Sequence, residues 1–156
     1  MKDRLNSRVK QRAWFRPAPA ILEERMSEFF EIDQLDPFMT MAPKVRAGKA
    51  HLIPAAVHFD GTARLQTVGR STNPLLHAVI EEFAGLTGVP VVLNTSFNLH
   101  EPIVESPADA VSCYLRTQMD VLVIGNFYSA REGRPTQARR RDEEQSPATY
   151  DIASVK

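Results

Sequence analysis

The clearest helix and the clearest strand predicted by the pattern of apolar and polar positions lie next to each other, in the second half of the chain. Asn73 followed by Pro74 is a helix N-cap with proline at the first position, and Gly88 is a typical helix end. A short apolar run at residues 89–93 follows and predicts a strand covered on both faces. Six apolar residues at helical spacing predict the buried face of the helix: Leu75, Leu76, Val79, Ile80, Phe83 and Leu86.

A second helix and a second strand follow in the same order. Ser106, Pro107 and Asp109 form the pattern of a capping box with proline at the first helical position. The apolar run at residues 121–124 then predicts another buried strand. Strand, helix and strand with short connections predict a parallel strand pair, and therefore an α/β fold.

The pattern in the first half of the chain is less regular. Residues 20–30 carry apolar positions at helical spacing and predict a helix with one buried stripe. Residues 37–45 alternate loosely and predict an edge strand that is interrupted by a proline. Within residues 53–68, the dipeptide Asp60-Gly61 predicts a turn between two short strands.

Length and composition fit one globular domain. The chain has 156 residues, 43% hydrophobic and 24% charged, and its formal net charge of zero excludes a strongly basic or acidic surface over the whole molecule. The single cysteine, Cys113, predicts a small core residue in a reducing compartment. The lack of a long apolar run and the charged N-terminus predict a cytoplasmic protein without a membrane span. A change in composition predicts a domain at residues 1–130 and a disordered tail at residues 131–156.

Charge is unevenly distributed, because the first sixteen residues carry six cations and one acid. Residues 9–12 alternate as in a strand, which would place Lys10 and Arg12 side by side and let both bind one phosphate. The alternative is a solvated basic face, which is the usual fate of a charge run. Residue spacing does not decide between these two interpretations.

Small polar side chains follow the strand predicted at residues 89–93, namely Asn94, Thr95, Ser96 and Asn98. In open α/β sheets, ligands bind just outside the carboxyl ends of strands, so these residues are candidates for a binding site. The alternative is that they only cap the strand and turn the chain, since Asn, Ser and Thr readily hydrogen-bond to nearby backbone.

Two further candidates flank the predicted turn at Asp60. Arg64 is either an exposed side chain without a role or a binding group, and His58 is expected to be a hydrogen-bonded structural residue. The histidines stand at no recognisable metal-ligand spacing, so no metal site is predicted. They are His51, His58, His77 and His100.

Four separated blocks of the sequence, taken together, resemble the C-terminal domain of the carbamoyltransferase family that includes the nodulation and antibiotic O-carbamoyltransferases. The resemblance runs from residue 3 to residue 128, with the blocks in the family's order. That domain is similar to the YrdC-like fold, so the resemblance implies an α/β fold with a twisted mixed sheet and flanking helices. The blocks are residues 9–17, 58–67, 93–104 and 107–110.

The resemblance also implies an adenylate-forming site. Members of the YrdC-like fold form acyl-adenylates with a Lys-x-Arg pair and a Ser-x-Asn pair, which match Lys10 with Arg12 and Ser96 with Asn98. The implied catalytic residues are Lys10, Arg16, Arg64 and Ser96. The implied binding residues for ATP and carbamoyl phosphate are Lys10, Arg12, Arg16, Arg64, Thr95, Ser96 and Asn98.

The implied chemistry has two steps, and a domain of this kind serves the first. ATP, with Mg²⁺, and carbamoyl phosphate give carbamoyl-adenylate and pyrophosphate, a step that needs mainly positioning and neutralisation of charge. An N-terminal, actin-like domain that holds iron then passes the carbamoyl group to a hydroxyl acceptor. That domain is expected on a separate chain or in a larger enzyme, and a homo-oligomer is the alternative assembly.

Two other functions stay open. Relative to the family pattern, the chain is one residue shorter within residues 15–19, lacks a residue between His100 and Glu101, and begins after an arginine-containing segment. These differences favour a nucleotide-binding module without turnover as the second hypothesis. An RNA-binding protein is the third, but stacking aromatics are few, and phosphate attraction alone gives only non-specific binding. Nucleic acid and membranes are therefore not expected partners.

Overall fold

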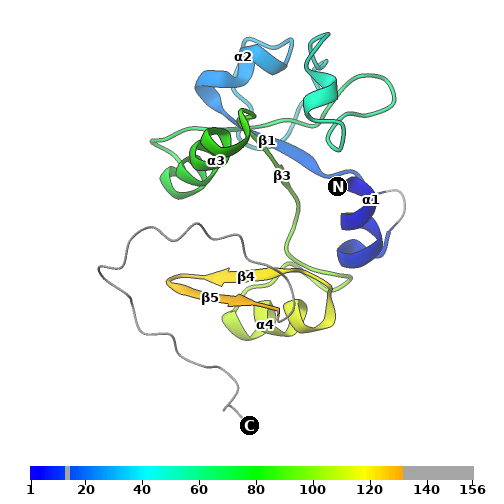
Figure 1. Ribbon diagram of the computed structural model, residues 1–156, viewed down its shortest axis with the longest axis vertical. Helices are drawn as coiled ribbons and strands as arrows, with labels where there is room; N and C mark the ends of the chain where they lie inside the picture. The colour runs from blue at the N-terminus through cyan, green and yellow to red at the C-terminus, as the bar shows by residue number, and fades with distance from the viewer. Residues whose placement is uncertain (13–14, 132–156) are drawn as a thin grey trace.

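A three-stranded mixed sheet organises the molecule and establishes the predicted α/β fold. The computed structural model describes residues 1–12 and 15–131. The strands are β1 (Ala18–Leu22), β2 (Gln66–Val68) and β3 (Val91–Asn94), in the order β2-β1-β3. The central strand β1 runs parallel to β2 and antiparallel to β3. Figure 1 labels β1 and β3.

Strand β1 replaces the first part of the helix predicted at residues 20–30. All of its residues are buried, and Ile21 aligns with a residue of each neighbouring strand. Pro19 disfavours a helix here because it has no N–H to donate, and the apolar residues of a strand buried on both faces imitate a helical stripe. Helical structure begins only afterwards, as a 3₁₀ turn at Glu23–Arg25 and helix α2 at Met26–Phe29.

Helix α3 (Pro74–Thr87) is confirmed, but its buried face is not the predicted one. The side chain of Asn73 caps it by accepting a hydrogen bond from a first-turn N–H, and Gly88 ends it with a φ of +77°. Only His77 and Ile80 are buried, because the helix packs mainly on β3 and β1 and the sheet is narrow. Four residues predicted to be buried are instead exposed: Leu75, Val79, Phe83 and Leu86.

Helix α4 (Pro107–Arg116) begins at the predicted capping box. The Ser106 side chain accepts from the backbone N–H of Asp109, and the Asp109 carboxylate accepts from the backbone N–H of Ser106. Cys113 on this helix is fully buried, as predicted, and burial raises the pKa of its thiol.

The predicted parallel pair of strands around α4 is wrong. Strand β4 (Val121–Ile124) forms an antiparallel hairpin with β5 (Phe127–Ala130), and β3 pairs with β1 instead (Figure 1). Gly125 turns the chain back at once with a φ of +55°. Only Leu122 of β4 is buried, so this apolar run is not the core strand that its composition predicts.

The basic N-terminal segment is helical, so the strand predicted at residues 9–12 is wrong. Helix α1 (Lys2–Leu5) continues into a π-helix at Asn6–Lys10, and Gln11 ends it in the left-handed conformation with a φ of 50°. Alternation over four residues is too short a pattern to distinguish a strand from a wide helical turn.

Residues 37–45 and 53–68 contain less strand than predicted. The first segment is irregular and makes only isolated bridges near its end. The turn at Asp60-Gly61 is confirmed, since the Asp60 carboxylate accepts from the N–H of Thr62 and Gly61 has a φ of +80°. After the turn, only β2 becomes a strand, so the predicted hairpin does not form.

Two apolar clusters form the core, one on each face of β1. Ile21 packs with a cluster that includes Phe29, Phe30 and Leu65, whereas its neighbours along the strand pack with Ile80 of α3. In the described part of the chain, no helix is both long and apolar enough to cross a membrane. Apart from its first residue, the tail predicted at residues 131–156 lies outside the described residues.

Candidate functional site

Lys10 lies at the centre of a cluster with Ser96 and Asn98. Its ammonium donates to the backbone oxygen (2.6 Å) and the hydroxyl (3.1 Å) of Ser96, and to the backbone oxygen (3.1 Å) and Oδ1 (3.0 Å) of Asn98. The lysine comes from the N-terminal helical segment and its partners from the loop after β3. The Lys-x-Arg and Ser-x-Asn pairs therefore meet at the lysine, across 86 residues of sequence.

The loop after β3 is held in shape by its own polar side chains. The hydroxyl of Ser96 donates to Oδ1 of Asn98 at 2.7 Å, and Nδ2 of Asn98 donates to the backbone oxygen of Glu101 at 2.7 Å. Because the amide nitrogen is bonded to a carbonyl, the amide oxygen faces the ammonium. These side chains thus turn the chain and also surround a cation, which combines the two interpretations that the sequence left open.

The charge of Lys10 is held in a confined place. The residue is 2% exposed, and its ammonium lies 5.2 Å from the centroid of the Phe15 ring. Burial, followed by repulsion from Arg12, lowers the pKa of Lys10 below its ordinary value. An ammonium has three protons, and here four oxygens surround it, so a bound anion would have to displace at least one of them.

Arg12 reaches the next part of the same loop. Its guanidinium lies 3.4 Å from the backbone oxygen of Leu99 and 3.4 Å from Nδ1 of His100. Lys10 and Arg12 therefore both contact the loop at residues 96–100. The π-helix that ends at Lys10, and not the predicted strand, places them beside this loop.

Arg16 and Arg64 make up the second cluster of predicted cations, and both belong to the electrostatic surroundings of His58. The guanidinium of Arg16 lies 5.6 Å from the centroid of the Phe59 ring and borders a hollow of about 210 Å³ together with Lys2 and His58. Burial, then the charge of Arg16 and to a smaller extent that of Arg64, lowers the pKa of His58. The His58 ring contacts the hydroxyl of Thr62 at 3.1 Å, as expected of a structural histidine.

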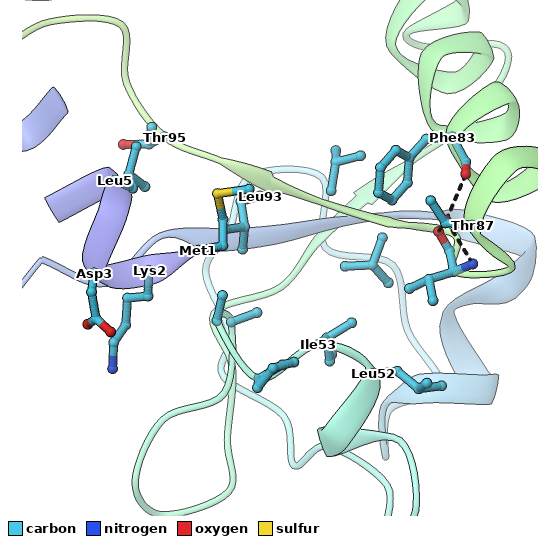
Figure 2. A pocket seen from close by; sticks show the side chains of 16 residues that line it. Met1, Lys2, Asp3, Leu5, Leu52, Ile53, Phe83, Thr87, Leu93 and Thr95 are labelled. Atoms are coloured by element: carbon cyan, nitrogen blue, oxygen red, sulfur yellow. Dashed lines mark hydrogen bonds between the residues drawn. The ribbon is translucent and has the colours of Figure 1, made fainter. Parts of the chain in front are cut away.

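Thr95 faces a different environment from Ser96 and Asn98. Its hydroxyl is buried without a hydrogen-bond partner among the described residues. The residue lies at one end of an apolar groove of about 800 Å³. In Figure 2 this groove runs along β3 from Leu5 and Leu93 to Phe83 and Thr87, with Leu52 and Ile53 opposite the strand.

The seven residues of the predicted site thus occupy three environments. Lys10, Arg12, Ser96 and Asn98 form one cluster, Arg16 and Arg64 a second, and Thr95 the end of the groove. Sequence reasoning missed three neighbours of these groups: Lys2, Phe15 and Glu101. Phe15 and Glu101 stand inside the quoted motif blocks, which is the signal that would have found them.

Glu101 stabilises the loop from its far end. Its carboxylate accepts from the N–H of His100 at 3.0 Å and from the guanidinium of Arg116 at 2.8 Å. Hydrogen bonds from its own N–H, from that of His100, from that of Leu99 and from Arg116 lower the pKa of Glu101 from 4.5 to about 2. The carboxylate therefore stays charged in neutral and mildly acidic solution.

Comparison with known proteins identifies the family. The family described as Carbamoyltransferase C-terminus matches residues 1–131. The chain belongs to this family. It is 51% identical to nodulation protein NolNO of Sinorhizobium fredii and 51% identical to nodulation protein NolO of Bradyrhizobium diazoefficiens, in each case over 81% of the chain. It is also 39% identical to the uncharacterized protein MJ1051 of Methanocaldococcus jannaschii, again over 81% of the chain.

The chain spans about a quarter or less of the length of these relatives. The matched region is 19% of NolNO, 24% of NolO and 25% of the archaeal protein. The region matched by the family, residues 1–131, contains every residue of both clusters described above.

Proposed function

We propose that the chain is the C-terminal domain of a carbamoyltransferase, and that it binds ATP and carbamoyl phosphate to form carbamoyl-adenylate. A further, N-terminal domain that holds iron would then pass the carbamoyl group to a hydroxyl acceptor. Membership of the carbamoyltransferase C-terminus family supports the general class of reaction. The division of labour between two domains comes from the resemblance described above.

The observation that carries this proposal is the convergence of Lys10 on Ser96 and Asn98. Burying an ammonium costs free energy unless its protons are hydrogen-bonded, and here all of them have acceptors. The cluster lies just beyond the carboxyl end of β3, where α/β proteins commonly bind ligands. A cation already positioned there by two loop residues is suited to a phosphate that takes the place of one of their oxygens.

Formation of carbamoyl-adenylate first requires carbamate. Water cleaves carbamoyl phosphate to carbamate and inorganic phosphate. A carbamate oxygen then attacks the α-phosphorus of ATP, the bond from that phosphorus to the bridging oxygen breaks, and pyrophosphate leaves with the electron pair. Such a transfer needs little covalent help, so catalysis comes from alignment and neutralisation of charge.

We assign the two clusters to different anions. Lys10 and Arg12 would neutralise the ATP phosphates, while Ser96 and Asn98 orient them or the carbamoyl amide through hydrogen bonds. Arg16 and Arg64 would hold carbamoyl phosphate, because planar guanidiniums bind phosphate oxygens in bidentate fashion.

Mg²⁺ would arrive with ATP. Among the described residues, no group of three or more His, Cys, Asp or Glu side chains is placed to hold a metal ion. The cations and neutral polar groups of both clusters suit phosphate oxygens, and Mg²⁺ commonly keeps several waters and binds through substrate phosphates.

A nucleotide-binding module without turnover is the second candidate. The saturation of the Lys10 ammonium by four protein oxygens favours it, because a cation that is fully bonded has less to offer a reaction. Both candidates predict that the chain binds ATP, and they differ in whether pyrophosphate is released.

Calorimetric titration with Mg-ATP, and separately with carbamoyl phosphate, tests whether the site binds these ligands. We expect saturable heat with ATP that falls at least about tenfold in affinity in Lys10→Gln, which corresponds to about 1.4 kcal/mol. Lys44→Gln is the matched control, since Lys44 is exposed and its side chain makes no hydrogen bond or ion pair with the described residues. No heat and no shift in Tm at millimolar ligand would exclude both candidates.

A further inference from the structure

Strand β3 has an open edge. It pairs with β1 on one side, and among the described residues no strand pairs with the other side. Pro19 of β1 lies opposite Leu93 and has no N–H, so these two residues cannot exchange both bonds of a hydrogen-bonded pair. The backbone groups of Leu93, and by alternation those of Val91, therefore point away from β1. Such an edge is a template for another strand.

The open edge adjoins an apolar groove. Val91, Leu93 and Thr95 line it along β3, and Leu52 and Ile53 line it from the opposite side (Figure 2). Its volume of about 800 Å³ is large enough for several side chains of an extended segment. The buried hydroxyl of Thr95, which has no partner among the described residues, would gain one from a polar group seated at this end of the groove.

The exposed face of α3 continues the same surface. Leu75, Val79, Phe83 and Leu86 follow one another at helical spacing, and their exposed fractions are 78%, 53%, 39% and 80%. Phe83 also lines the groove, so the helix face and the groove are continuous. A continuous exposed apolar surface of this kind marks an interaction site in soluble proteins.

We infer that the open edge of β3, the groove and the exposed face of α3 together dock an extended apolar segment from the part of a carbamoyltransferase that lies outside the region matched by this chain. This inference rests on the proposed function. The segment adds a strand to β3, places alternate apolar side chains in the groove and covers α3. The lengths of the relatives favour this occupant over a second copy: NolNO and NolO are 51% identical to the chain in this region, which is only 19% and 24% of their lengths.

A chimaera tests this docking. Full-length NolO of Bradyrhizobium diazoefficiens is made with its matching region replaced by residues 1–131 of this chain, and hydrogen exchange is compared with that of the chain alone. The amides of Val91 and Leu93, which do not bond to β1, are expected to exchange at least about tenfold more slowly in the chimaera. Amides of β4 and β5 serve as the internal reference. Unchanged exchange at Val91 and Leu93 overturns the inference.

Two variants show whether the same surface is responsible. Val79→Arg is expected to restore fast exchange of β3 in the chimaera, while Leu115→Arg, on an exposed apolar position of α4, leaves the protection unchanged. Sedimentation of the chain alone is expected to show a monomer. A dimer that Val79→Arg dissociates would overturn the inference in favour of self-association.

Titration with ATP on the same samples separates this inference from the proposed function. Protection of β3 in a chimaera that binds no ATP would contradict the proposed function and leave the docking surface intact. ATP binding without protection of β3 would contradict the docking surface and leave the proposed function intact.

Discussion

The ammonium of Lys10 lies 3.0 Å from Oδ1 of Asn98, and the same oxygen accepts the hydroxyl proton of Ser96. One amide oxygen thus joins the N-terminal helical segment to the loop after β3. The contact is both a tertiary restraint and the centre of the proposed site, so changes there are expected to affect stability and ligand binding to different extents.

Lys10→Ala is expected to destabilise the fold as well as to weaken nucleotide binding. Loss of the ammonium removes the donor to the backbone oxygens of Ser96 and Asn98, while Oδ1 of Asn98 keeps the Ser96 hydroxyl. An acceptor left unsatisfied away from water costs about 1–3 kcal/mol. Urea unfolding should therefore show a lower midpoint, by about 2 kcal/mol in the free energy of unfolding. Lys44→Ala should stay within about 0.5 kcal/mol of the parent. Equal midpoints for the two variants would show that the cluster contributes nothing to stability.

Ser96→Ala is expected to separate the two roles. Lys10 keeps the backbone oxygen of Ser96 and both oxygens of Asn98, so the loss of stability should be below about 1 kcal/mol. The hydroxyl proposed to meet the ligand is lost, so affinity for Mg-ATP should fall, as measured by calorimetry. If circular dichroism shows a much lower Tm while affinity is unchanged, Ser96 only shapes the turn.

The sequence predicted the local features well and their pairing poorly. The caps at Asn73 and Ser106 and the turn at Gly61 each depend on a few adjacent residues, and all three are confirmed. The partner of a strand depends on distant parts of the chain. Apolar residues at 18–22 suit a central strand and a helical stripe equally well, which is why β1 was predicted as part of a helix.

Glu101→Gln is expected to flatten the acid side of the stability profile. The pKa of Glu101 is lowered from 4.5 to about 2, so its charged form is favoured in the folded state. Its contribution is fully present above pH 4.5 and is lost as the pH falls from 4.5 towards about 2. The difference in free energy of unfolding between parent and variant should therefore shrink across this range.

Thermal unfolding at a series of pH values measures that difference. Glu105→Gln, which changes an exposed carboxyl close by, is the control. Its difference from the parent should not show the decline from pH 4.5 to about 2 that is expected for Glu101→Gln. A parent-to-variant difference for Glu101→Gln that stays constant from pH 4.5 to about 2 would contradict the assigned hydrogen bonds.

Arg16→Ala and Arg64→Ala are expected to weaken binding of carbamoyl phosphate without a change in stability. Both side chains are exposed, and removal of an exposed arginine usually changes stability by no more than about 0.5 kcal/mol. Loss of a charge-assisted phosphate contact costs about 1.5–3 kcal/mol, so affinity should fall about tenfold or more in calorimetry. Arg8→Ala, another exposed arginine of the basic segment, should bind as the parent does. Equal losses in all three variants would indicate general charge attraction.

The meeting of the Lys-x-Arg and Ser-x-Asn pairs was predictable, whereas the separation of the other candidate residues from them was not. Residue type and motif spacing pointed to Lys10, Ser96 and Asn98, which meet as the two pairs imply. The motif blocks carry no information on where side chains point, so they did not reveal that Arg16 lies against the ring of Phe59. Apolar residues at helical spacing likewise show which face of α3 is apolar. They do not show whether another part of this chain covers that face.

Pyrophosphate exchange tests the proposed adenylation most directly. The chain is incubated with Mg-ATP, carbamoyl phosphate and labelled pyrophosphate, and the label appearing in ATP is followed over time. Because adenylation is reversible and needs no hydroxyl acceptor, we expect slow exchange that depends on carbamoyl phosphate, with no carbamoylated product from an added acceptor. ATP binding without such exchange would contradict adenylate formation and leave the non-catalytic module, and transfer to an acceptor by the chain alone would contradict the division of labour between domains.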